Sequence, residues 1–380
     1  MYAPKVQNVR FGDKQQDECF VCGLGTALEK IDLNEMHDAS QLTTIASVLV
    51  CTTCRNMYPS LHKARLVRVR LLIKRKQSSQ ESCEEEILHP TSLRYLEVIF
   101  NDLEFLSPSA IALLWNLVAF SFFPTILLPS EIWGMPQLRH FLGLAQFILP
   151  DQEVSQDSVI MENLQTVSNI RNFRCTREVL EIIPNLKQLG ISFQGRNGET
   201  KWGLYHLHNL VRLHHLESLS IKADNLPLEE LTFPTSLKEL CLEGRVIPSK
   251  KARTICSALP NLETLKLRLF NAYKGNGWDQ FEGEFPRLKA LEISRSGLKT
   301  WNTENIHFPN LESLFLSYLL RLEEIPTDIG DIPTLRSIHV ELCNDFLIES
   351  AKQMVEEQYE NGNESLQLYI NKVKYQVGRG

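Results

Sequence analysis

Four cysteines near the beginning of the chain have the spacing of a metal site. Two C-x2-C pairs, Cys19 with Cys22 and Cys51 with Cys54, supply four thiolates, a set that can bind Zn²⁺ tetrahedrally. The 28 residues between the pairs exceed the usual gap of such a site. The residues before Cys51, Val48-Leu-Val, also fit the inward side of a strand, where cysteine acts as a small apolar residue. We favour structural cysteines and expect no metal, with a zinc site as the alternative.

A basic stretch follows at residues 62–76. Arginines alternate there with apolar residues, so a strand would place Arg68 and Arg70 outward. Such a patch can attract an acidic partner surface, and a solvated strand face fits the pattern equally well. Its last three residues also resemble a nuclear-import cluster. The basic patch comprises Arg65, Arg68, Arg70, Lys74, Arg75 and Lys76.

The remaining polar residues form no catalytic pattern. The chain contains no P-loop, no G-x-S-x-G elbow, no H-E-x-x-H helix and no kinase motif set. His206, His208, His214 and His215 cluster in a segment with a leucine stripe, which indicates solvated histidines rather than a metal site. We therefore expect no enzymatic activity, no cofactor and no small-molecule substrate.

Charge and cysteine content narrow the class of protein. A net charge of −6 and a pI of about 6.0 do not favour a nucleic-acid binder. Nine cysteines are too few for a disulfide scaffold, and the first residues show no signal peptide, so we expect a cytoplasmic protein. Residues 105–130 carry no charge, but Pro108, Pro124 and Pro129 interrupt them. We expect buried repeats there rather than a membrane span.

A repeated sequence pattern indicates the fold that positions the polar residues described above. The segment from Leu93 reads L-x-x-L-x-L-x-x-N-x-L, with Val98 in one leucine place. Leucines two apart point to one face of a strand, and stacked copies can bury that face together. From Leu237 the copies begin 25, 26, 23 and 24 residues apart. Copies start at Leu186, Leu216, Leu237, Leu262, Leu288, Leu311 and Leu335.

The pattern predicts an α/β repeat solenoid, a leucine-rich-repeat horseshoe with short parallel strands on its concave face. We expect an irregular segment at 1–45, the solenoid at 46–345 and a cap of one helix and one strand at 346–380. The cap helix should cover Leu347–Glu360 and end at Asn361-Gly362, and Leu366, Leu368 and Ile370 alternate like a final strand.

The expected contact surface consists of the side chains beside the inward leucines. Solenoids use their concave face for binding, and aromatic residues and arginine dominate interface energies. The predicted partner-binding residues are Lys187, Glu217, Lys222, Lys238, Glu239, Glu263, Lys266, Arg268, Lys289, Glu292, Phe315, Tyr318, Arg336 and His339. Their expected ligand is another protein.

Residues 90–373 resemble the leucine-rich-repeat region of plant coiled-coil NB-ARC immune receptors of the late blight resistance type. The resemblance lies in stretches such as 129–140, 285–293 and 322–335. It implies recognition of a pathogen effector or a guarded host protein, and contact with a nucleotide-binding NB-ARC domain. Met36-His37-Asp38 resembles the family's nucleotide-sensing motif, but no P-loop domain precedes it. A substrate-recruiting adaptor of a ubiquitin ligase, with a structural zinc site, is the alternative function.

Overall fold

The computed structural model forms two compact units. Unit 1 comprises Met1–Arg171 and Glu181–Leu186, and unit 2 comprises Asn172–Leu180 and Lys187–Gly380. The structure describes residues 8–10, 47–51, 68–73, 95–100, 119–123, 126–127, 130–148, 159–194, 201–224, 226, 231–244, 259–269, 277–278 and 285–377.

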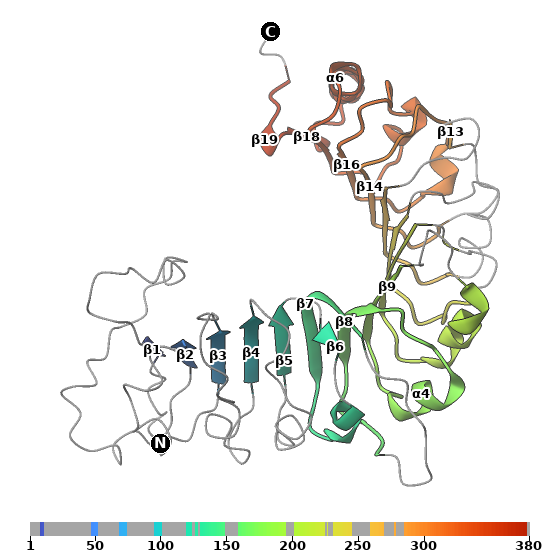
Figure 1. The fold of residues 1–380 in the computed structure, drawn as a ribbon. Coiled ribbons are helices and arrows are strands. Elements are labelled where there is room, and N and C mark those ends of the chain that lie inside the picture. The colour runs from blue at the N-terminus through green and yellow to red at the C-terminus, as the bar shows by residue number, and fades with distance from the viewer. Residues whose placement is uncertain are drawn as a thin grey trace, which may run out of the picture. The chain divides into compact units, whose positions relative to one another are not determined.

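Unit 1 is a row of parallel strands. In order of pairing these are β1 (Asn8–Arg10), β2 (Ser47–Cys51), β3 (Arg68–Ile73), β4 (Tyr95–Phe100), β5 (Ala119–Phe123), β7 (His140–Ile148) and β8 (Thr166–Arg171) (Figure 1). The short β6 (Ile126–Leu127) also pairs with β7, and the 3-10 helix η5 covers Ser130–Gly134. A register shift interrupts the β7–β8 pairing between Leu142 and Phe147.

The apolar stretch at 105–130 contains strands β5 and β6 in its described part. Among the residues that the structure describes, no helix combines the length and the apolar character that crossing a bilayer requires.

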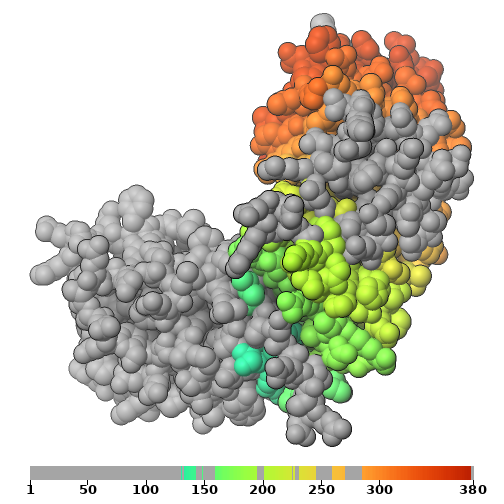
Figure 2. Space-filling view, turned by 45° about the vertical axis from the view of Figure 1, so that its right-hand side comes forward, coloured from blue at the N-terminus to red at the C-terminus, as the bar shows by residue number. Residues whose placement is uncertain are grey.

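Unit 2 is a second row of parallel strands. Its order is β9 (Gln188–Phe193), β10 (Ser218–Ala223), β11 (Glu239–Glu243), β12 (Thr264–Arg268), β14 (Ala290–Ser294), β16 (Ser313–Ser317), β17 (Ser337–Glu341) and β18 (Gln367–Ile370). Figure 2 shows its described residues changing colour gradually from green to red, because successive repeats stack in chain order.

Among the described residues that connect strands, several short helical turns occur. Between strands of unit 2 they are η6 (Trp202–Leu204), η7 (Leu207–Arg212), η9 (Asn305–His307) and η10 (Thr327–Ile329), and α4 (Arg177–Ile182) lies between β8 and β9. A separate two-stranded sheet joins β13 (Gly277–Trp278) to β15 (Thr300–Trp301).

The leucines of unit 2 align from strand to strand as the repeat predicts. Leu240 pairs with Leu265, Leu265 with Leu291, and Leu291 with Leu314. These four side chains are at most 2% exposed. Burying each one contributes about 1.5–3 kcal/mol, which a single repeat could not obtain alone. The predicted solenoid of parallel rungs is therefore confirmed.

Asparagine side chains before some strands and left-handed residues after others shape the turns of unit 2. Before two strands, an asparagine amide donates to a carbonyl of the previous repeat, Asn261 to Thr235 at 2.8 Å and Asn310 to Pro286 at 2.7 Å. After four strands the chain turns through a left-handed residue, with φ between 51° and 54°. These residues are Leu269, Arg295, Tyr318 and Leu342.

Helix α6 (Asp345–Glu360) and a hairpin form the end of unit 2. The helix begins two residues before the predicted Leu347, because the Asn344 side chain accepts the Leu347 N–H at 2.9 Å and caps its first turn. Strand β19 (Val373–Lys374) then pairs antiparallel with β18 through a turn in which Asn371 and Lys372 have positive φ. This hairpin covers the edge of the last parallel strand, which would otherwise be open to further pairing.

Candidate protein-binding surface

The surface of interest is the face of unit 2 opposite the buried leucines, which we call the open strand face. Alternate residues of each strand point to it, since side chains alternate across a sheet. The strand register aligns its central positions into one row that crosses eight strands. In order, the row is Gly190, Ser220, Cys241, Lys266, Glu292, Phe315, His339 and Tyr369.

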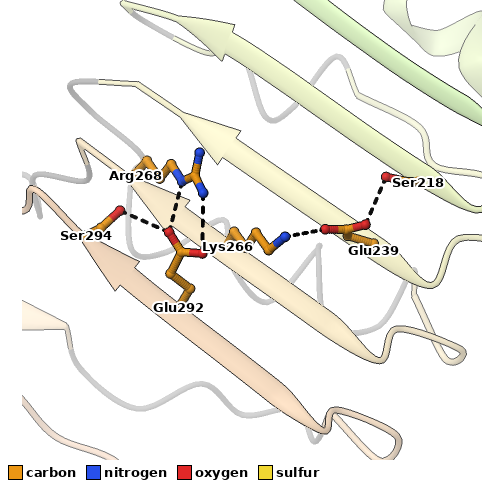
Figure 3. Close-up of polar contacts among 6 residues, drawn as sticks. All are labelled: Ser218, Glu239, Lys266, Arg268, Glu292 and Ser294. Carbon is orange, nitrogen blue, oxygen red and sulfur yellow. Dashed lines mark hydrogen bonds and ion pairs between the residues drawn. The ribbon is translucent and has the colours of Figure 1, made fainter. Parts of the chain in front are cut away.

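The charged rungs are strands β10, β11, β12 and β14. Their side chains bond to one another across the strands (Figure 3). Lys266 donates to Glu239 at 2.5 Å, and Ser218 donates to the second Glu239 oxygen at 3.1 Å. The Arg268 guanidinium donates two bonds to the Glu292 carboxylate, at 3.0 and 3.4 Å. These bonds lower the pKa of the Glu239 carboxyl and raise that of Arg268, against the opposing effect of burial.

A further row of charges lies immediately before the strands, and we call it the strand-entrance row. Each backbone N–H in it donates to the carbonyl of the previous member, so the row is continuous across seven repeats. Its side chains alternate in sign. They are Lys187, Glu217, Lys238, Glu263, Lys289, Glu312 and Arg336.

Ion pairs join neighbours within this row. Lys238 Nζ lies 3.2 Å from Glu217, and Lys289 Nζ lies 2.9 Å from Glu263. Lys222, on the open strand face, pairs in the same way with Glu243. Many of the predicted partner-binding charges are thus matched within the chain, so a partner must replace bonds that already exist. Exchanging a half-exposed ion pair within the chain for one with a partner therefore adds little to the affinity for that partner.

The aromatic rungs, strands β16 to β18, carry stacked rings at the central row instead of paired charges. Phe315 stacks on His339 with ring centroids 4.4 Å apart, and His339 stacks on Tyr369 at 4.7 Å, both nearly parallel. On one side of the stack, Ser337 donates to Ser313; on the other side Glu341 follows His339 on β17. Phe315 keeps 38% of its surface exposed, so the stack offers apolar area that no described residue covers fully. Burial lowers the pKa of His339, which favours the neutral ring.

Tyr318 was predicted on the strand face and lies instead at the left-handed residue just after β16. It is 45% exposed, and the Arg295 guanidinium lies 5.4 Å from its ring centroid. Leu320, Leu342 and Phe346 are also strongly exposed in the segments that follow β16 and β17. These three residues and Tyr369 were not among the predicted partner-binding residues.

Several predicted groups lie partly or wholly outside the described residues. Arg68 and Arg70 stand on β3, without described side chains, and the other four residues of the basic patch lie outside. Cys51 ends β2, whereas Cys19, Cys22 and Cys54 lie outside, so the expectation of structural cysteines and its alternative, a zinc site, are both untested. Within the described part of the chain, no three His, Cys, Asp or Glu residues come together as a possible metal site. The histidines of the cluster at 206–215 are exposed.

Aligned parallel rungs over a leucine core define a leucine-rich-repeat protein. The chain belongs to the leucine-rich repeat region family, whose model matches residues 44–378. More specifically, it is related to the repeat region of plant disease-resistance proteins.

Curated relatives come from Solanum demissum. Putative late blight resistance protein homolog R1B-16 is 33% identical over 291 residues, which is 73% of this chain and 22% of the relative. Late blight resistance protein R1-A is 31% identical over 299 residues, again 73% of this chain and 22% of the relative. The chain therefore spans less than a quarter of the length of these two relatives.

Solved structures show more distant likeness. In the mouse RP105/MD-1 complex the match has 13% identity and a TM-score of 0.48, and covers 85% of this chain and 59% of that chain. A leucine-rich-repeat protein of Leptospira interrogans matches with 18% identity and a TM-score of 0.39, over 78% of this chain and 90% of that chain.

Proposed function

We propose that this chain is the recognition region of a plant disease-resistance protein, acting in the cytoplasm on a pathogen effector or a guarded host protein. The observation that carries the proposal is the aromatic stack of Phe315, His339 and Tyr369 on the open strand face. Aromatic side chains lose little conformational entropy on binding and dominate interface energies. The charged rungs beside them are already paired, so they would orient a partner rather than supply most of the affinity.

The family also supports contact with an NB-ARC switch domain. The relatives are several times longer than this chain, and a recognition region needs a switch to report binding. We propose that such a domain contacts the repeats away from the aromatic rungs, so that both partners can bind in one assembly.

Domain exchange tests the proposal. This chain would replace the matching repeats of late blight resistance protein R1-A from Solanum demissum. The hybrid would then be expressed in leaves with a library of late blight effectors. We expect a quiet hybrid that triggers cell death with particular effectors. Phe315→Ala combined with Tyr369→Ala should abolish that response, whereas the exposed control Glu324→Ala should retain it.

Two results would contradict the proposal. A hybrid that responds to no effector while being stable and abundant would remove the recognition role. A response that survives the double aromatic variant unchanged would move recognition away from these rungs.

A further inference from the structure

A polar hollow lies beside the strand-entrance row, on repeats that the aromatic rungs do not include. Two rows of residues line it, one from the strand-entrance row and one from the turn two or three residues earlier. The lining comprises Lys187, His214, His215, Glu217, Ser236, Lys238, Asn261, Glu263 and Arg287. We call it the entrance hollow, and all of it belongs to unit 2.

The turn side of the hollow is held by hydrogen bonds between repeats. Ser236 donates to the Leu216 carbonyl at 2.8 Å, and Asn261 donates to the Thr235 carbonyl at 2.8 Å. Arg287 in turn donates to the Asn261 side chain at 2.9 Å, which holds its guanidinium beside the hollow. Because these bonds tie side chains to neighbouring repeats, a ligand would meet a preformed surface.

The lining of the hollow carries more basic than acidic side chains: Lys187, Lys238 and Arg287 against Glu217 and Glu263. Its two carboxylates are already matched, Glu217 by Lys238 and Glu263 by Lys289. The Lys289 ammonium lowers the pKa of Glu263, which keeps that carboxyl ionised in its pair. Lys187 and Arg287, at opposite ends, form no ion pair among the described residues; Arg287 also helps to lower the pKa of Glu263, but that carboxylate already pairs with Lys289. The hollow is thus locally cationic in a chain whose net charge is −6.

We propose that the entrance hollow binds an acidic segment of a partner protein, with one carboxylate at Lys187 and another at Arg287. Four strand steps, β9 to β14, separate these two repeats. At about 4.8 Å per step the distance is roughly 19 Å, which an extended chain covers in about six residues. His214 and His215, both exposed, lie between the ends and can hydrogen-bond the segment's backbone.

The alternation of the strand-entrance row adds selectivity for register. An acidic side chain placed one step away from Lys187 faces Glu217, and one placed three steps away faces Glu263. Like charges brought together at an interface cost affinity. A segment whose acids are correctly spaced therefore binds better than one with the same composition in another order.

Fluorescence anisotropy with the full chain tests the proposal. The probe is a labelled peptide of about nine residues that carries two aspartates at each end of a Gly-Ser spacer, at an ionic strength of about 50 mM. Comparison peptides carry lysines at the same places, or all four aspartates at one end. We expect the spaced acidic peptide to bind at least about 10-fold more tightly than the lysine peptide and about 3-fold more tightly than the clustered one.

Charge reversal locates the site. Lys187→Glu with Arg287→Glu should weaken binding of the spaced peptide at least about 10-fold, because both end contacts become repulsive. The control, Lys299→Glu with Arg321→Glu, changes the net charge equally at exposed residues outside the hollow and should leave binding within about 2-fold. Equal losses in the two variants, or no preference for acidic over basic peptide, would overturn the proposal.

This site is independent of the proposed recognition surface. The double variant Phe315→Ala with Tyr369→Ala should bind the spaced acidic peptide like the unchanged chain. The leaf response and the peptide affinity therefore report on the two proposals separately.

Discussion

Removing one leucine from an interior rung should cost more than removing one from the last rung. Leu314 is fully buried and lies between Leu291 and Ile338 at the same register. The hydrogen-bonded strands on both sides prevent the repeats from closing over a cavity. We expect Leu314→Ala to lower the free energy of unfolding by about 3–5 kcal/mol, in the upper part of the range for such substitutions.

Leu368 provides the matched comparison. It is 1% exposed but has one neighbour of the parallel register, Ile338, because β18 is the last parallel strand. The two-residue β19 can shift more easily than a full strand. We expect Leu368→Ala to cost about 2–3 kcal/mol, near the lower limit for a buried leucine.

Urea unfolding followed by circular dichroism gives both values, with hydrogen exchange to show which repeats open first. Because repeat arrays can unfold in stages, transitions monitored by different probes must coincide before one free energy is assigned. A loss from Leu314→Ala no larger than that from Leu368→Ala would refute the stacked-rung reasoning.

Three further outcomes follow from particular contacts. Stability should fall as the pH drops below about 6.5, because burial depresses the pKa of His339 and the unfolded chain then takes up the proton more readily; His339→Gln should flatten this part of a urea-midpoint profile against pH. Asn344→Ala should cost about 2–3 kcal/mol, since it removes the cap of α6 and two amide bonds to the Leu319 and Leu322 carbonyls, and thermal unfolding measures the loss. Gly244→Ala should cost about 1–3 kcal/mol in the same assay, because a Cβ there would lie 2.4 Å from the Ala223 carbonyl oxygen, whereas Gly134→Ala meets nothing within 4 Å and serves as the control.

The register of unit 2 could be predicted from the sequence because burial demands it. Leucines two apart, as in Leu265 and Leu267, must share one face, and a slip of one residue would expose both. The fixed period then places each strand beside the next. The division into two units was not predicted, because nothing in the leucine period marks it.

The aromatic stack was only half visible in the sequence. Phe315 and His339 are 24 residues apart, the same interval as between the leucines that begin their repeats, so alignment of the repeats places them side by side. Tyr369 follows His339 by 30 residues, because α6 lengthens the last repeat. The sequence pattern indicated that the strand carrying Tyr369 belongs to the C-terminal cap, so it was not expected to extend the binding face.

The pairing of charges could not be predicted from one repeat at a time. Alternation along a strand places Lys266 outward, but its choice of Glu239 over Glu292 depends on side-chain directions across three strands. Arg268 takes Glu292 with two bonds, which leaves Lys266 to the other side (Figure 3). A planar guanidinium suits a two-oxygen contact better than an ammonium does, which accounts for this division.

The two parts of the open strand face therefore make different demands on a partner. At the charged rungs, a partner must offer one replacement bond for each pair that it opens, so the gain is small and a misplaced partner meets like charges. At Phe315 and Tyr369, a partner gains apolar contact without breaking an ion pair. Affinity should consequently come from the aromatic rungs and register from the charged ones. Substituting an aromatic residue should then weaken every partner that binds there, whereas reversing a whole ion pair such as Arg268 with Glu292 should change which partner is preferred.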